Sequence, residues 1–218
     1  MSHPFPISNA NLSHAWAEAL LRVAGGPLND PPPLCVTITG FESNEPLEDS
    51  EVRAALDIEL ASKGKNPIDV SALVVFPYKM WKRHGCPPCR EFSKYCTDKY
   101  TPRLKARNRN NRRGLYFERM MQYEYYDSDG KLHQHNQLAY IIDWWKKQRQ
   151  GGKRPRRSGL QVTCFDPRKD HNALPRLAFP CLQQVGFSYG EDKDQLTVNA
   201  FYPTQFIFDR AYGNYLSR

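Results

Sequence analysis

Apolar side chains recur at helical spacing over residues 11–24, and Gly25 with the glycine and proline after it ends the run. This spacing predicts a helix over residues 11–24. Residues 34–40 are rich in β-branched side chains and follow three prolines, which predicts a strand entered from a stiff turn. Residues 48–62 predict a helix with a charged surface, and the apolar residues 70–75 predict a second strand or a buried segment.

The second half of the chain contains both helix-like and strand-like patterns of apolar residues. Aromatic and Met side chains over residues 116–126 predict a partly buried helix or strand, and residues 127–130 (Asp-Ser-Asp-Gly) predict a turn. Residues 136–148 predict an amphipathic helix. Its large apolar side chains gather on one side: Leu138, Ile141, Ile142 and Trp145. Residues 177–189 and 195–202 predict two strands joined by a Gly-Glu-Asp-Lys-Asp turn.

Residues 78–113 are polar, basic and turn-rich, and they contain Cys86-Pro-Pro-Cys89 and Cys96. A zinc site needs four ligands, and His84 is the available fourth. The second Cys-x-x-Cys or His pair that strong zinc motifs contain is missing. A redox dithiol is another interpretation, although no thioredoxin-like βαβ pattern surrounds the pair. We favour a third interpretation, an exposed loop with incidental thiols.

The length and the cysteines limit the class of protein. A chain of 218 residues can bury one sizeable core, which predicts a single domain over residues 1–218. No apolar run is long enough to cross a bilayer, and the first residues do not follow the pattern of a secretion signal. The six cysteines are scattered, which suits a reducing compartment. We therefore expect a cytoplasmic protein without a membrane partner.

The formal net charge is +8 and the isoelectric point is about 9.2. Much of the positive charge lies in residues 103–113 and 146–157, both of which the pattern predicts to be exposed loops. Such charge attracts anions, which include nucleotides, nucleic acids and solvent counterions. The charge alone does not choose among them.

Cys181 is the strongest candidate for chemistry. It follows Pro180 and lies in the first of the two predicted C-terminal strands, where a rigid sheet can aim a thiol into a cleft. On spacing alone a small buried apolar residue is the simpler interpretation. Asn214 lies downstream, and its amide offers both a hydrogen-bond donor and an acceptor. A turn residue after Gly213 is the alternative for Asn214.

Several segments appear in an order and spacing that together resemble the thymidylate synthase family. The segments are Gly114–Arg119, Asn136–Asp143, Arg156-Arg157, Leu160–Pro167, Pro180-Cys181 and Leu196–Asn214. The resemblance covers roughly residues 114–218. Residues 1–113 match less well and include a basic, Cys-bearing insertion at about 78–113.

The resemblance implies an α+β fold, a thymidylate-synthase-like mixed sheet with helices packed on one face. It also implies a homodimer formed through the other face of the sheet. The implied reaction adds the Cys181 thiolate to C6 of a uracil ring. C5 then attacks a one-carbon unit carried by 5,10-methylenetetrahydrofolate, so the implied substrate is a pyrimidine nucleotide like dUMP.

The resemblance also assigns roles to individual residues. Tyr116 matches the family's active-site tyrosine, and Asn214 matches the asparagine that pairs with the O4 and N3 edge of uracil. The other implied substrate contacts are Arg156, Arg157, Thr204 and Gln184. The candidates for the family's catalytic glutamate are Glu118, Glu91 and Glu59.

Two departures from the family keep other hypotheses open. Pro203 and Phe206 stand where the family has an arginine and an acidic residue, and the sequence ends at Arg218, ahead of the family's ribose contacts and folate-closing tail. The second hypothesis is therefore a nucleotide-binding or regulatory protein that keeps the scaffold without the chemistry. A third is nucleic-acid binding through the two basic segments. Aromatic residues near those segments are Tyr100, Tyr116 and Trp144.

Overall fold

The computed structural model describes residues 5–26, 33–107, 109–153, 155–173, 180–190 and 195–216. The protein is α+β, with about half of it helical and the strands in small sheets. The chain, for which one domain was predicted, separates into two compact units. Unit 1 comprises Met1–Tyr78 and Gln205–Arg218, and unit 2 comprises Lys79–Thr204. Within the described ranges, no helix has both the length and the apolar character needed to cross a membrane.

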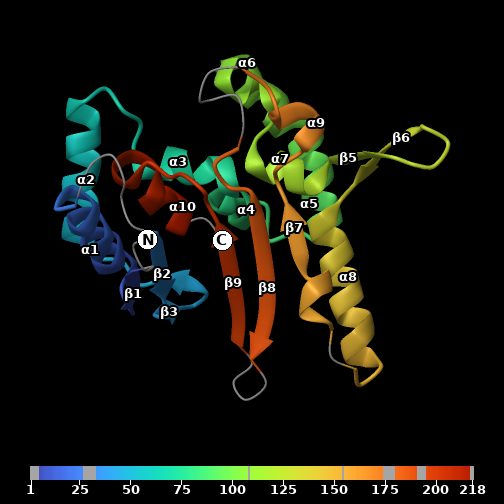
Figure 1. Cartoon of the computed structure of the whole chain (residues 1–218), viewed down its shortest axis with the longest axis horizontal. Coiled ribbons are helices and arrows are strands. Elements are labelled where there is room, and N and C mark those ends of the chain that lie inside the picture. The colour runs from blue at the N-terminus through green and yellow to red at the C-terminus, as the bar shows by residue number, and fades with distance from the viewer. Residues whose placement is uncertain are drawn as a thin grey trace. The chain divides into compact units, whose positions relative to one another are not determined.

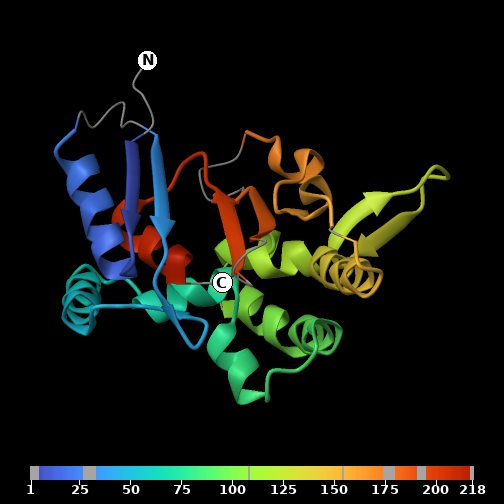
Figure 2. The ribbon, with the colours of Figure 1, turned by 90° about the horizontal axis from the view of Figure 1, so that it is seen from below.

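Unit 1 begins with a strand–helix–strand element. Strand β1 (Phe5–Asn9) pairs in parallel with β2 (Leu34–Ile38), and helix α1 (Leu12–Ala24) lies beside both strands (Figure 2). The Asn11 side chain accepts hydrogen bonds from the N–H groups of Ser13 and His14, which caps α1. The predicted helix over residues 11–24 is confirmed, and so is the strand predicted within residues 34–40.

The rest of unit 1 is mainly helical. Strands β3 (Phe41–Glu42) and β4 (Glu45–Pro46) form a short hairpin. Helix α2 (Ser50–Ser62), capped by Asp49, confirms the predicted charged helix. Residues 70–75, predicted as a strand or a buried segment, lie in helix α3 (Ile68–Val75), so the strand alternative is wrong. The buried side chains Ile68, Ala72 and Val75 follow helical spacing, and burial of that face overrides the β preference of the valines.

The two ends of unit 1 meet in its core. Seven buried residues form this core: Leu12, Trp16, Leu56, Leu60, Ile68, Ala211 and Tyr212. The last two come from the π-helical turn η5 (Ile207–Ala211) and helix α10 (Tyr212–Leu216). The Tyr212 and Ser13 hydroxyls lie 2.7 Å apart, and the Tyr212 hydroxyl donates to Glu48 at 2.7 Å. Hydrogen bonds and packing therefore hold α10 against α1.

Unit 2 opens with a run of short helices. These are α4 (Tyr78–Arg83, whose first residue belongs to unit 1), α5 (Cys89–Tyr95), π-helical η1 (Cys96–Tyr100), α6 (Thr101–Arg107) and 3₁₀-helical η2 (Arg109–Arg113). The loops predicted for residues 78–113 are therefore wrong. Phe92 and Cys96 are buried at helical spacing, and the many charges around them obscured this periodicity.

A hairpin and a long helix follow. Helix α7 (Tyr116–Met121) leads into β5 (Tyr123–Tyr126), which pairs antiparallel with β6 (Leu132–His135) around the predicted turn. This hairpin projects from the body of unit 2 (Figure 1). Helix α8 (Gln137–Gln150), capped by Asn136, confirms the predicted amphipathic helix. Ile142, expected on its apolar side, is exposed.

The described part of unit 2 ends in a three-stranded antiparallel sheet. Its strands are β7 (Gln161–Thr163), β8 (Gln184–Gly190) and β9 (Gln195–Phe201), in that order across the sheet. The 3₁₀ turn η3 (Arg157–Gly159) precedes β7, and helix α9 (Pro167–Asp170) follows it.

Both predicted C-terminal strands are confirmed, although the first starts only at Gln184. Residues 177–179 and the turn at 191–194 lie outside the described residues. The strands that the structure describes form four small sheets instead of one mixed sheet.

Close packing at Gly213 generates a test of unit 1. A Cβ atom on Gly213 would lie 2.9 Å from the Ser71 Cβ and 3.2 Å from the Ala72 backbone nitrogen. We expect Gly213→Ala to lower the free energy of unfolding by about 1–3 kcal/mol, although alanine is the better helix former. Equilibrium denaturation measures the change.

The matched control is Gly151→Ala at the end of α8. A Cβ atom there has its nearest neighbour at 3.6 Å, so the expected change is within about 0.5 kcal/mol. Equal effects of the two substitutions would contradict the close approach of α10 to α3.

Candidate functional site

A buried ion pair organises the interior of unit 2. The guanidinium of Arg119 on α7 donates to both carboxylate oxygens of Asp170 on α9, at 2.6 and 2.9 Å. The same guanidinium donates to the carbonyl oxygens of Cys164 at 2.8 Å and Arg113 at 3.0 Å. Arg119 is 9% exposed and Asp170 is 4% exposed. One side chain therefore links α7 to the ends of η2 and β7 and to α9.

Gln137 at the start of α8 adds hydrogen bonds to the backbone near this ion pair. Its side-chain amide donates to the Thr163 carbonyl at 2.9 Å and accepts from the Thr163 N–H at 3.0 Å. It also donates to the Arg119 carbonyl at 3.3 Å. A buried amide that bonds to backbone groups on both sides fixes the separation of the elements that carry them. Helix α8, strand β7 and helix α7 are held together in this way.

The structure brings the two predicted catalytic residues together. Tyr116 is the first residue of α7, and its hydroxyl oxygen accepts a hydrogen bond from the Cys181 N–H at 3.2 Å. Burial of the ring and the neighbouring Cys181 raise the pKa of Tyr116 well above its usual value. The phenol is therefore neutral at physiological pH and keeps its own O–H as a donor.

Cys181 lies in a bend three residues before β8 and is partly exposed. Its neighbours Pro180 and Leu182 are buried, which fixes the bend on both sides of the thiol. Cys164 and Cys96 are buried, and burial raises the pKa of each thiol to about 12. The interpretation as a small buried apolar residue suits Cys164 and Cys96 better than Cys181.

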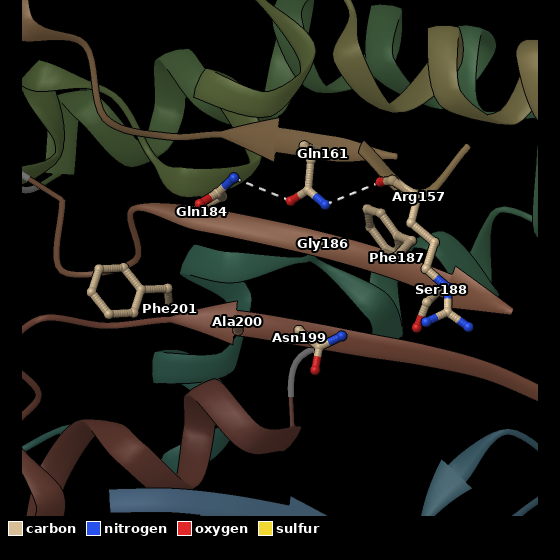
Figure 3. A pocket seen from close by; sticks show the side chains of 9 residues that line it. All are labelled: Arg157, Gln161, Gln184, Gly186, Phe187, Ser188, Asn199, Ala200 and Phe201. Atoms are coloured by element: carbon tan, nitrogen blue, oxygen red, sulfur yellow. Dashed lines mark hydrogen bonds between the residues drawn. The ribbon is translucent and has the colours of Figure 1, made fainter. Parts of the chain in front are cut away.

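A second feature is a groove on one face of the three-stranded sheet, with a volume of about 450 Å³ (Figure 3). The Gln184 amide donates to the Gln161 side-chain oxygen at 3.1 Å, and the Gln161 amide donates to the Arg157 carbonyl at 3.2 Å. Asn199 and Ser188 also line the groove. Two predicted substrate contacts, Arg157 and Gln184, therefore share one groove.

The other predicted substrate contacts are placed separately. Arg156 is exposed at the start of η3, and Thr204 is exposed three residues beyond β9. Asn214 belongs to unit 1, where it lies half-buried in α10, so the prediction of a turn at Asn214 is wrong. The helix at this position follows from the packing of Tyr212 and Gly213 against the unit 1 core.

The three glutamate candidates have different surroundings. Glu118 accepts from the Leu115 N–H at 3.1 Å and pairs with Lys105, so it caps α7. Glu59 pairs with Lys63 on the exposed side of α2, and Glu91 is exposed in the first turn of α5. The contacts of Glu118 give it a structural role.

The thiols between residues 86 and 96 also have separate surroundings. Cys86 is exposed with a φ of 56°, Cys89 is half-buried near the Ser93 hydroxyl, and Cys96 is buried. The His84 ring packs on Tyr95 with ring centres 4.4 Å apart. Over the residues that the structure describes, no group of three or more His, Cys, Asp or Glu side chains could hold a metal ion. The geometry therefore gives no support to the zinc interpretation.

Comparison of this chain with protein-family models, curated proteins and solved structures finds no match. The functional interpretation therefore depends on the residues and their geometry.

Sequence reasoning did not single out Arg119, Asp170, Gln137 or Gln161. A signal for Arg119 is present, because this charged residue stands beside Phe117, Met120 and Met121, all of which are buried. A charge within an apolar run indicates a buried partner. The identity of that partner, 51 residues away, is not visible in the local pattern.

We expect Arg119→Leu to lower the free energy of unfolding by about 3–5 kcal/mol, because Asp170 then stays buried without its counter-ion. Chemical denaturation with a spectroscopic signal from unit 2 measures the change. The control is Lys169→Ala, which removes a more exposed ion pair with Glu124 and is expected to cost about 0–1 kcal/mol. Similar losses in both variants would mean that the Arg119–Asp170 pair does not anchor unit 2.

Proposed function

We propose that the protein is a thymidylate-synthase-like transferase. It moves a one-carbon unit from 5,10-methylenetetrahydrofolate to C5 of a pyrimidine nucleotide such as dUMP, with Cys181 as the nucleophile. The observation that supports this most strongly is the hydrogen bond from the Cys181 N–H to the Tyr116 hydroxyl. These residues are 65 positions apart, and the family resemblance assigns a catalytic role to both.

The proposed chemistry begins at the Cys181 sulfur. The thiolate bonds to C6 of the pyrimidine ring, and the electrons of the C5–C6 double bond move toward C5 and the C4 carbonyl. A bound reduced folate would supply the one-carbon unit that C5 takes up, with loss of the C5 proton and release of the Cys181 sulfur from C6. Tyr116 fixes the backbone of Cys181 and offers its own O–H as a hydrogen-bond donor beside the sulfur. A neutral donor at this position stabilises negative charge without forming a competing ion pair.

The proposed substrate contacts follow from the donors that each side chain presents. A guanidinium such as that of Arg157 can hold a phosphate by two hydrogen bonds, and Gln184 lies in the same groove. Arg156 and Thr204 are the other proposed phosphate ligands. The Asn214 amide would pair with the uracil edge, where an aspartate would favour cytosine.

Reduced folate enters the proposal only through the resemblance, because geometry ties none of the described side chains to it. The folate would supply the one-carbon unit. The homodimer is also part of the proposal. Leu196 and Val198 are exposed apolar side chains on one face of β9, which supports the proposal that a second copy of the chain covers this strand.

A second candidate function is nucleotide binding on the same scaffold without turnover. Pro203 and Phe206, which replace the family's arginine and acidic residue, favour it. A proline offers neither a cation nor an N–H to a phosphate. Both candidate functions bind the same nucleotide. They differ in whether a one-carbon unit is added to its C5 atom.

Isothermal titration with dUMP, and with dCMP as the control, tests the proposed pocket. We expect dUMP to bind more tightly, and Asn214→Asp to reverse the preference because a carboxyl presents a different hydrogen-bonding edge. Cys181→Ala should keep the dUMP affinity and lose folate-dependent turnover. Absence of binding to either nucleotide would overturn both candidates, whereas binding without turnover in the unmodified protein would select the second.

We expect Tyr116→Phe to lower turnover by about tenfold or more, because the partly buried Cys181 N–H loses its acceptor and the sulfur loses a donor. The affinity for dUMP should change little. Single-turnover kinetics and the rate of Cys181 alkylation by iodoacetamide measure the effect. Tyr140→Phe, at an exposed tyrosine on α8, is the control. Unchanged alkylation and turnover in Tyr116→Phe would remove the proposed role of the tyrosine.

A further inference from the structure

The positive charge of the protein is concentrated in the helical segment at residues 79–113. This segment contains twelve Lys and Arg residues and two acidic residues, which gives it a net charge of +10. The whole chain carries +8, so the other residues together carry −2. The structure places this charge on consecutive helices and not on a loop. Helices hold their side chains at fixed spacings, and the charges therefore form a defined surface.

Three of these cations follow one another at intervals of four residues along η1 and α6. They are Lys99, Arg103 and Arg107, and all three are exposed. Residues four apart lie on the same side of a helix. The stripe they form is here called the cationic stripe. Lys105 on the neighbouring face is engaged with Glu118, which leaves the stripe as the outward-facing charge of α6.

An exposed aromatic surface lies on the β5–β6 hairpin. The Tyr125 and His133 rings stack with centres 5.4 Å apart and planes at 24°, and His135 meets the edge of Tyr125 at 6.4 Å. His135 in turn packs on Tyr140 of α8 at 5.4 Å. Tyr125 is 44% exposed and Tyr140 is 52% exposed. These four rings are here called the aromatic platform.

Helix α8 connects the aromatic platform to the basic segment. Asn136 and Asp143 both contact α5, through the Ser93 hydroxyl and the Arg90 guanidinium respectively. Tyr140 lies four residues after Asn136 and three before Asp143, so it shares their side of the helix. The platform thus begins where α8 packs on α5, the helix that leads directly into η1 and α6.

We propose that unit 2 binds single-stranded nucleic acid, with bases stacked on the aromatic platform and phosphates held by the cationic stripe. Stacking rings beside positive charge are the combination by which proteins hold single strands without reading their sequence. A duplex keeps its bases paired and cannot present their faces to the rings. An acidic peptide supplies negative charge but not successive flat rings. This inference is independent of the proposed transferase function.

Fluorescence anisotropy with a fluorescein-labelled single-stranded oligonucleotide of about 20 thymidines and the full chain tests the proposal. The salt concentration is varied, and the logarithm of the binding constant should fall linearly with the logarithm of salt, by about 0.7 for each phosphate contact. A duplex of the same length and a strand of abasic sites are the comparison ligands. Both should bind the unmodified protein at least about tenfold more weakly.

Two variants separate stacking from charge. Tyr125→Ala with Tyr140→Ala should weaken binding by about tenfold or more, and Tyr125→Phe with Tyr140→Phe should keep it because the rings remain. Replacement of Lys99, Arg103 and Arg107 by Gln should reduce the slope of the logarithm of the binding constant against the logarithm of salt by about 2. Replacement of three exposed lysines elsewhere in unit 2 is the matched control and should leave the salt dependence unchanged: Lys146, Lys147 and Lys153.

Circular dichroism establishes that each variant is folded. If the double alanine variant unfolds, Tyr140→Ala alone replaces it, since the Tyr140 side chain is 52% exposed. The proposal is overturned if the unmodified protein does not bind the single strand at low salt, or binds the duplex or the abasic strand equally well. It is also overturned if folded tyrosine variants bind as the unmodified protein does, or if the control lysines have the same effect as the stripe.

Discussion

The buried pair of Arg119 and Asp170 is the constraint on which the rest of unit 2 depends. All four terminal N–H bonds of the guanidinium are used, two by the carboxylate and two by backbone carbonyls. Its Nε, which is also buried, has no hydrogen-bond partner among the described residues. Removing two charges from water is unfavourable unless the geometry satisfies nearly every donor and acceptor. The pair therefore fixes α7, and with α7 the position of Tyr116 next to Cys181.

Local signals predicted the elements whose ends are capped and whose apolar residues follow one period. Asn11, Asp49 and Asn136 each lie at or next to the start of a predicted helix and cap the helix in the structure. The errors have a common cause in tertiary packing. Residues 70–75 have the composition of a strand, but three of the buried side chains of α3 align only in a helix. Residues 78–113 look like a loop because a few buried side chains are hidden among twelve cations.

The part of the candidate site that could be predicted is the part marked by the order of motifs along the sequence. The resemblance selected Cys181 and Tyr116, which are in contact, and Arg157 and Gln184, which share a groove. Contacts between distant segments that leave no local pattern could not be predicted. Asp170 is one of four residues in a short polar helix, and Gln161 is one amide in a three-residue strand. The stacked rings of the β5–β6 hairpin depend on strand register, which composition does not specify.

The two units carry net charges of opposite sign, which the net charge of the whole chain does not show. Unit 1 carries a net −5 and unit 2 a net +13, so the isoelectric point of the whole chain describes neither. Like charges within a compact body repel one another, and this repulsion opposes folding. Dissolved ions screen it over about 8 Å at physiological ionic strength. Unit 2 is therefore the part of the protein whose folded state is stabilised more by salt.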